Sequence, residues 1–119
     1  MNRNNQILFL DTEAKLNINI EPIGSLTMDD YDFIIDVYCN SNGNILSFNK
    51  SDLIRVDENN YIAKVDTTKL DVGVIKVKVM AYIPDSDFSD GYRTEVTYIN
   101  TGINLKNDKY IEKPWAVSV

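Results

Sequence analysis

Histidine is absent from the 119-residue sequence, and cysteine occurs only once, at Cys39. Without an imidazole group, the chain cannot supply a histidine metal ligand, a histidine general base or the Ser-His relay of many hydrolases. A single cysteine cannot form a disulfide within the chain, which is typical of proteins kept in a reducing cytoplasm. The five glycines are isolated from one another, so no glycine-rich phosphate loop is present.

Positive charge and long apolar runs are also scarce. Lysine and arginine number 12 against 18 aspartate and glutamate residues, which gives a net charge of −6. This charge disfavours binding to nucleic-acid phosphates and to acidic lipid surfaces. No apolar run approaches the roughly 20 residues of a membrane span, and residues 1–5 lack the apolar stretch of a secretory signal. We expect a protein that stays in the compartment where it is made.

The residues that are abundant favour strands. The chain has 14 Ile, 10 Val and 7 Thr against 4 Ala and 8 Leu. Branched side chains fit the pleated surface of a sheet better than they fit a helix. The length suits one domain that buries a sizeable core.

Short alternating segments bounded by turn residues recur along the chain, which is typical of a sandwich. The predicted strands are 16–20, 33–39, 45–48, 53–56, 61–65, 75–83 and 92–99, with possible edge strands at 7–10 and 103–105. We therefore expect an all-β fold, an immunoglobulin-like antiparallel β-sandwich with extended terminal arms. Residues 1–13 form an N-terminal arm or edge strand, 14–105 the sandwich and 106–119 the extended C-terminal arm.

Three local patterns sharpen this expectation. The dipeptide Asn42-Gly43 predicts a type I′ hairpin turn, because both residues tolerate positive φ. Residues 66–70 predict one helical turn, capped by Asp66 or Thr67, that crosses between the sheets with Leu70 as a plug. The segment 75–83 has five apolar residues at alternate positions and should be a central strand.

An acidic loop follows that segment, with Asp85, Asp87 and Asp90 as candidate calcium ligands. The glycine falls one place too late for an EF-hand and no helices flank the loop. The alternative is a solvated turn in which Phe88 points inward and Arg93 balances some of the charge. We expect no metal site, and we interpret the group Asp29, Asp30 and Asp32 as turn and surface residues.

Catalysis has little support. Cys39 alternates with apolar residues on the predicted dry face and has no evident base, which favours a core thiol. Carboxylate pairs of the kind that hydrolyse sugars could be drawn from these acidic groups. A small sandwich, however, offers little room for a cleft that excludes water. We expect no enzymatic activity, no catalytic residue and no cofactor.

Binding has more support. Unpaired strand edges can be extended by a partner chain. The sequence has seven tyrosines, and Tyr38, Tyr82, Tyr92 and Tyr98 serve equally as edge packing or as interface anchors. Lys76 and Lys78 are interpreted as solvated residues of the central strand.

The C-terminal segment changes character and contains the only tryptophan. We expect it to be an arm in which Tyr110, Ile111, Trp115 and Val117 contact a partner, since large aromatic residues make good anchors. The alternative is that Trp115 folds back over its own sandwich.

Five segments carry a resemblance to a known family: MDDYDF at 28–33, YIAKVDT at 61–67, IKVKV at 75–79, IPDSDF at 83–88 and DGYRTEV at 90–96. Through them, residues 16–105 resemble small immunoglobulin-like virion structural proteins of crAss-like tailed phages of Bacteroidales, of the capsid auxiliary or head-associated type. Residues 61–79 are more loosely similar to the immunoglobulin-like N-terminal domain of phage baseplate upper proteins.

The resemblance implies a non-enzymatic virion component made in the cytoplasm of the host bacterium and present in many copies per particle. The first expectation is a capsid auxiliary protein that binds the major capsid lattice. The alternative is an adaptor or anchor at the head-fibre base or the tail and baseplate. A lower alternative is a calcium-dependent carbohydrate-binding module. The expected partners are capsid or other virion proteins, with no nucleic acid and no membrane.

Overall fold

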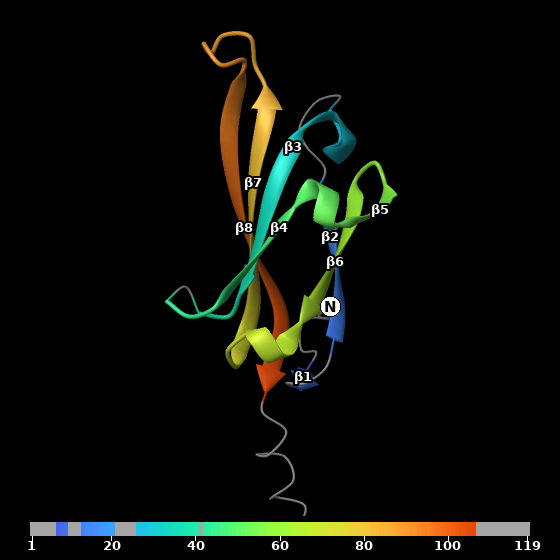
Figure 1. Ribbon diagram of the computed structural model, residues 1–119, viewed down its shortest axis with the longest axis vertical. Helices are drawn as coiled ribbons and strands as arrows, with labels where there is room; N and C mark the ends of the chain where they lie inside the picture. The colour runs from blue at the N-terminus through green and yellow to red at the C-terminus, as the bar shows by residue number, and fades with distance from the viewer. Residues whose placement is uncertain (1–6, 10–12, 21–25, 41, 107–119) are drawn as a thin grey trace, which may run out of the picture.

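The protein is an all-β sandwich of two sheets packed face to face (Figure 1). The computed structural model describes residues 7–9, 13–20, 26–40 and 42–106. The strands are β1 (Ile7–Phe9), β2 (Glu13–Asn19), β3 (Asp32–Tyr38), β4 (Ile45–Asn49), β5 (Ile54–Asp57), β6 (Asn60–Asp66), β7 (Gly73–Pro84) and β8 (Tyr92–Lys106). Short 3₁₀ helices are η1 (Met28–Asp30), η2 (Lys50–Asp52) and η3 (Thr67–Lys69). The expected all-β sandwich is confirmed.

The two sheets differ in size. One has five strands in the order β1-β8-β7-β3-β4, and the other has three in the order β2-β6-β5. All neighbours pair antiparallel except β1, which runs parallel to the end of β8 from Asn104 to Lys106. The possible edge strand at 7–10 is therefore present as β1.

The core lies between the sheets and follows the predicted alternation. In β7 the buried residues are Ile75, Val77, Val79, Ala81 and Ile83. In β3 they are Phe33, Ile35 and Val37. On the other side of the core, β2 contributes Leu16 and Ile18, and β6 contributes Tyr61, Ala63 and Val65. Because side chains alternate between the faces of a strand, each of these strands has one dry and one outward face.

The crossover from β6 to β7 has the expected helical turn. The side chain of Asp66 accepts a hydrogen bond from the backbone N–H of Thr68 at 3.0 Å and caps η3. Leu70 follows and is 4% exposed, so it closes the core at this end. This prediction is confirmed.

The loop between β3 and β4 is not the expected type I′ hairpin. Gly43 does not have a positive φ, and the turn runs from Asn40 to Gly43, closed by the Gly43 N–H to Asn40 carbonyl bond of 2.8 Å. A Cβ at Gly43 would lie 1.9 Å from a carboxylate oxygen of Asp71, which accepts the Asn44 N–H at 3.1 Å. The glycine thus leaves room for the Asp71 side chain against this turn, and the type I′ prediction was wrong.

The separate edge strand predicted at 103–105 is also wrong, because β8 continues through it. After Asn100 the register with β7 shifts, and the Thr101 hydroxyl donates to the carbonyl of Ile75 at 2.7 Å. Gly102 has a φ of +73°, a conformation that glycine adopts without strain. A bulge of this kind lets one strand bend and go on pairing.

The β7–β8 ribbon is longer than the sheet that covers it. These two strands have 12 and 15 residues, whereas the strands of the small sheet have four to seven. Figure 1 shows the ribbon rising past the end of β2, β6 and β5. Residues 94–98 of β8 are consequently exposed on both faces of the sheet.

Phe33 is expected to be the most sensitive core position. Its fully buried ring packs edge-to-face on Tyr61, with 5.3 Å between ring centroids, and on Tyr31 at 6.0 Å. Phe33→Ala should lower the free energy of unfolding by about 3–5 kcal/mol, since it leaves a large cavity. Urea denaturation measures the loss. The control is Phe88→Ala, at a side chain that is 50% exposed, which should cost less than about 0.5 kcal/mol; equal costs would contradict the assigned core.

Candidate interaction surface

Asp29 of η1 joins the two sheets at one end of the sandwich. Arg55 of β5 donates to both of its carboxylate oxygens, from Nε to Oδ1 at 2.9 Å and from Nη2 to Oδ2 at 2.7 Å. The hydroxyl of Tyr61 on β6 also donates to Oδ1. We call these three residues the Asp29 junction. Two-point guanidinium–carboxylate pairing of this kind is the strong form of an ion pair.

Lys50 adds a cation beneath this junction. Its Nζ donates to the carbonyl oxygens of Asp29 at 3.1 Å and Tyr31 at 2.8 Å. The same atom lies 5.5 Å from the ring centroid of Phe33 and 5.9 Å from that of Tyr61. Its charge is therefore directed at backbone oxygens and aromatic faces, which is a stable place for an ammonium group.

Contacts within the Asp29 junction shift the pKa values of two of its side chains. Hydrogen bonds from Arg55 and then Tyr61 lower the pKa of Asp29 from 3.8 to about 2. Burial, reinforced by the bond to Asp29, raises the pKa of Tyr61 from 10.0 to about 12. The folded protein thus favours the charged carboxylate and the neutral phenol.

The outer side of the five-stranded sheet carries a second feature. The pairing registers of β3, β7 and β8 place the four tyrosines named above on this one side. The pairs are Tyr38 with Lys76, Tyr82 with Asp32, Tyr92 with Pro84 and Tyr98 with Lys78. Tyr98 is 68% and Tyr92 50% exposed. Lys76 and Lys78 share this side and, as expected, point away from the core.

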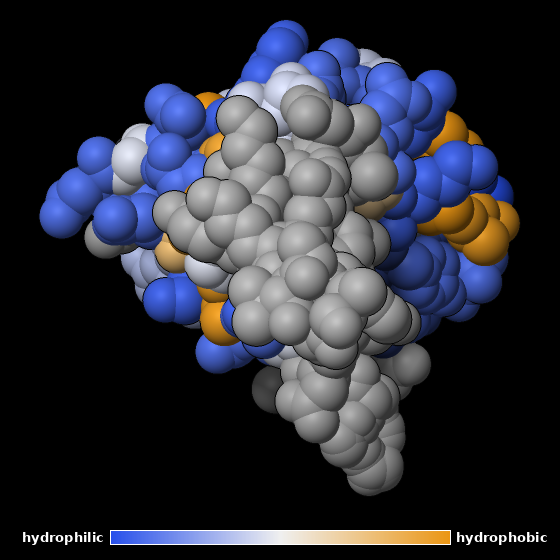
Figure 2. All heavy atoms as spheres, turned by 90° about the horizontal axis from the view of Figure 1, so that it is seen from below, coloured by the Kyte–Doolittle hydropathy of each residue, from blue (hydrophilic) through white to orange (hydrophobic). Residues whose placement is uncertain are grey.

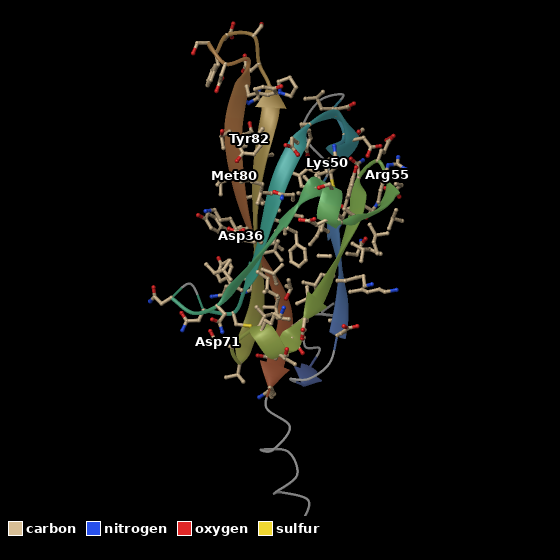
Figure 3. The ribbon with its side chains drawn as sticks, in the orientation of Figure 1. Asp36, Lys50, Arg55, Asp71, Met80 and Tyr82 are labelled. Carbon is tan, nitrogen blue, oxygen red and sulfur yellow. The ribbon has the colours of Figure 1, made fainter. Side chains whose placement is uncertain are left out.

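Apolar side chains lie among these tyrosines. Ile34, Met80 and Val96 are neighbours in one row across β3, β7 and β8, and Val96 is 43% exposed. Figure 3 shows Met80 and Tyr82 on the side of the sheet away from Lys50 and Arg55. We call this surface the tyrosine face, made of Tyr38, Tyr82, Tyr92, Tyr98, Ile34, Met80 and Val96. Viewed from the end where β8 stops, the coloured residues are mostly hydrophilic, with separate apolar patches (Figure 2).

A groove of about 550 Å³ continues the tyrosine face toward η1. It is lined by Asp29, Asp30, Tyr31, Asp32, Lys50, Tyr82, Pro84, Asp90, Tyr92 and Thr94. Asp32 and Asp90 each use one carboxylate oxygen for a neighbouring backbone N–H, at 2.9 and 3.1 Å, and no described residue bonds to the other oxygen. The groove therefore combines aromatic walls with an excess of negative charge.

The acidic loop keeps its carboxylates apart. Asp85 accepts from the N–H of Asp87 at 3.0 Å and from Arg93 at 3.2 Å, while Asp90 turns back to the N–H of Tyr92. Among the described residues, no three His, Cys, Asp or Glu side chains gather in a way that would hold a metal ion. Asp85, Asp87 and Asp90 are thus not brought together as calcium ligands.

Of the two expectations for side chains in this loop, the one for Arg93 is confirmed and the one for Phe88 is wrong. Arg93 does balance loop charge through its ion pair with Asp85. Phe88, however, is 50% exposed and does not point inward, because the loop extends beyond the part of the sandwich that could cover it.

Cys39 is a core thiol, as expected. It is 8% exposed and donates weakly to the carbonyl of Gly73, with 3.7 Å between sulfur and oxygen. Burial, and to a lesser extent Asp71, raises its pKa, which disfavours the reactive thiolate.

The Asp29 junction is not predicted by the sequence, in which Asp29 has only the pattern of a turn and surface residue. A capping box between Thr27 and Asp30 does form, and the sequence could have indicated it. The partner Arg55 lies 26 residues away, and no local pattern links the two.

The arm residues Tyr110, Ile111, Trp115 and Val117 lie outside the described residues, so their expected role stays a prediction. The part of the chain that the structure describes contains no helix with the length and hydropathy needed to cross a bilayer.

No protein-family model, no curated protein and no solved structure matches this chain. Its function is therefore argued from the surface itself.

The Asp29 carboxylate should govern acid stability. Because its pKa is lowered on folding, its contribution is complete above about pH 4 and is lost as the pH falls toward 2. Asp29→Asn should be less stable than the parent at pH 7, and the difference should shrink between pH 4 and 2 in urea titrations. The control Asp87→Asn, at a carboxylate that bonds to no described residue, should follow the parent; a pH-independent gap for Asp29→Asn would contradict the assignment.

Tyr61 should govern alkaline stability in the opposite sense. Because its pKa is raised on folding, the neutral phenol stabilises the fold fully below about pH 10, and this contribution is lost as the pH rises toward 12. Tyr61→Phe should cost about 1 kcal/mol at pH 7 for the lost hydrogen bond. It should then lose less stability than the parent between pH 10 and 12 in thermal melts. Tyr98→Phe, at the most exposed tyrosine described, should behave like the parent at every pH.

Proposed function

We propose that this chain is a non-enzymatic structural protein of a bacteriophage virion that works by binding other virion proteins. The specific role we propose is a capsid auxiliary protein on the major capsid lattice. One observation carries the proposal: the tyrosine face gathers aromatic and apolar side chains on the outer side of the large sheet, where Tyr92, Val96 and Tyr98 are exposed and the others are half-buried. The resemblance of residues 16–105 to small virion proteins supplies the class of partner.

The composition of this face suits protein binding. Tyrosine and methionine are enriched in the cores of protein interfaces, and a tyrosine ring offers apolar area together with a hydroxyl. The face is built on three paired strands, so the side chains are held in place before a partner arrives. Binding then costs little conformational ordering. The acidic groove at its end favours a partner with basic side chains around an apolar patch.

The strand order supports an immunoglobulin type of sandwich. The orders β2-β6-β5 and β8-β7-β3 correspond to strands B-E-D and G-F-C, and β4 lies beside β3 where variable-type domains add a strand. Such sandwiches serve many proteins as binding modules, so the fold alone carries no activity.

A binding role also agrees with the available chemistry. The sequence has no histidine, and Cys39 is buried with a raised pKa. Histidine therefore cannot serve as the base of covalent catalysis here, and Cys39 is poorly placed to serve as its nucleophile.

An adaptor at the head-fibre base or the tail is the second candidate, since it would use the same face. Labelling of purified particles with gold-coupled antibody separates the two candidates. Dense labelling over the head supports the auxiliary protein, sparse labelling at a tail or fibre supports the adaptor, and no labelling contradicts the virion proposal.

Ile34→Thr should weaken particle binding about tenfold or more, because it places a hydroxyl in the middle of the tyrosine face. Co-sedimentation of the purified variant with particles that lack the protein measures this. Ile62→Thr is the matched control: both isoleucines are half-buried on the outward side of a strand that has a neighbour on each side, Ile34 on β3 of the large sheet and Ile62 on β6 of the small one. Equal binding by both variants would contradict the proposed face.

A further inference from the structure

The outer edge of β8 is open along most of its length. β7 pairs with β8 on one side from Tyr92 onward, but on the other side β1 pairs only with Asn104–Lys106. No strand among the described residues occupies this edge between Tyr92 and the bulge at Thr101. Figure 1 shows this part of β8 as the outermost strand of the ribbon. Its outward backbone N–H and C=O groups are therefore free to pair with another chain.

Several of the devices that protect an edge strand from pairing are missing here. Between Tyr92 and Asn100 it has no lysine, no proline and no bulge. Its two charges, Arg93 and Glu95, are joined by a bond of 2.9 Å within the strand. Residues 94–98 are exposed on both sides, so a second strand meets no obstacle from the small sheet.

The sequence of this edge is complementary to itself. If two copies pair antiparallel about a two-fold axis at Thr94, Thr94 faces its own counterpart. Arg93 of each copy then lies opposite Glu95 of the other. Tyr92 lies opposite Val96, which are 50% and 43% exposed in the single chain.

Each of these pairings belongs to a type that stabilises antiparallel sheets: opposite charges, an aromatic ring beside a β-branched side chain, and paired threonines. A two-fold interface uses the same surface on both copies, so each of the two pairs that lie off the axis occurs twice. Shifting the axis by one residue, to Arg93 or to Glu95, would place two like charges opposite each other. The charges therefore favour the register centred on Thr94 over the two registers next to it.

We propose that two copies of this chain associate through β8, with Thr94 on the two-fold axis, and join their five-stranded sheets into one continuous sheet. The tyrosine faces of the two copies then lie on the same side, with Tyr98 and Val96 of each near the junction. This association is independent of the virion role, because it requires only the chain itself. Its small contact area makes it reversible and dependent on protein concentration.

Charge reversal tests the pairing. In sedimentation equilibrium of the full chain, the parent should dimerise, and Arg93→Glu and Glu95→Arg should each raise the dissociation constant about tenfold or more, since two attractive pairs become repulsive. An equimolar mixture of the two variants should dimerise again, because each copy then faces opposite charges. Lys64→Glu, an exposed charge reversal on β6, should dimerise like the parent.

A parent protein that is monomeric at all concentrations would overturn the proposal. A dimer whose dissociation constant is unchanged by these charge reversals would overturn it as well. Recovery in the mixture shows that each single variant is folded. Particle binding is measured with Ile34→Thr, and dimerisation is measured in a separate assay with the Arg93 and Glu95 variants. Either proposal can therefore fail while the other holds.

Cross-linking tests the register directly. Thr94→Cys should form a disulfide between copies under mild oxidation, since directly opposed Cβ atoms lie about 4.5–5.5 Å apart. Thr97→Cys is the matched control on the same exposed strand: the two copies of residue 97 would be six positions apart along the strand, roughly 20 Å. Cross-linking through residue 97 in preference to 94 would overturn the proposed axis.

Discussion

The alternation of side chains along β7 is the constraint on which the rest of this sandwich depends. Five inward residues from Ile75 to Ile83 are buried at every second position, and β7 pairs with β3 on one side and β8 on the other. A shift of one residue would expose all five, so the register of the large sheet is strongly specified. The same alternation turns Lys78, Met80 and Tyr82 outward, and the tyrosine face is thus a consequence of how the core is built.

The second constraint is a difference in length between the sheets. The small sheet covers the lower part of the β7–β8 ribbon, and η1 with its buried Met28 contributes to the core near β3. Beyond this cover β8 keeps its pairing with β7 but has no layer over either face. The edge that we assign to self-association lies on this uncovered ribbon, whereas the tyrosine face also includes residues of β3.

The two sheets are tied at one end by polar groups. In many immunoglobulin-type domains a disulfide spans the sheets, and a chain with one cysteine has no such bond available within itself. Here Arg55 and Tyr61, from the small sheet, converge on Asp29 at the entrance to β3. Ion pairs with exposed partners stabilise only modestly, but a buried phenol bound to a carboxylate fixes the relative position of the two layers.

Elements whose signals are local can be predicted from the sequence. Alternation over 75–83 and 61–65, and the capped turn at Asp66, are properties of neighbouring residues and were predicted correctly. Contacts between distant segments depend instead on how the strands are arranged in space. Asp71 shapes the loop at Gly43 from 28 positions away, Arg55 reaches Asp29 across the sandwich, and the four tyrosines share one side because of the registers between strands. The physical reason is that a strand's own pattern fixes which residues lie on the same face, but not which strand lies beside it or where that neighbour ends.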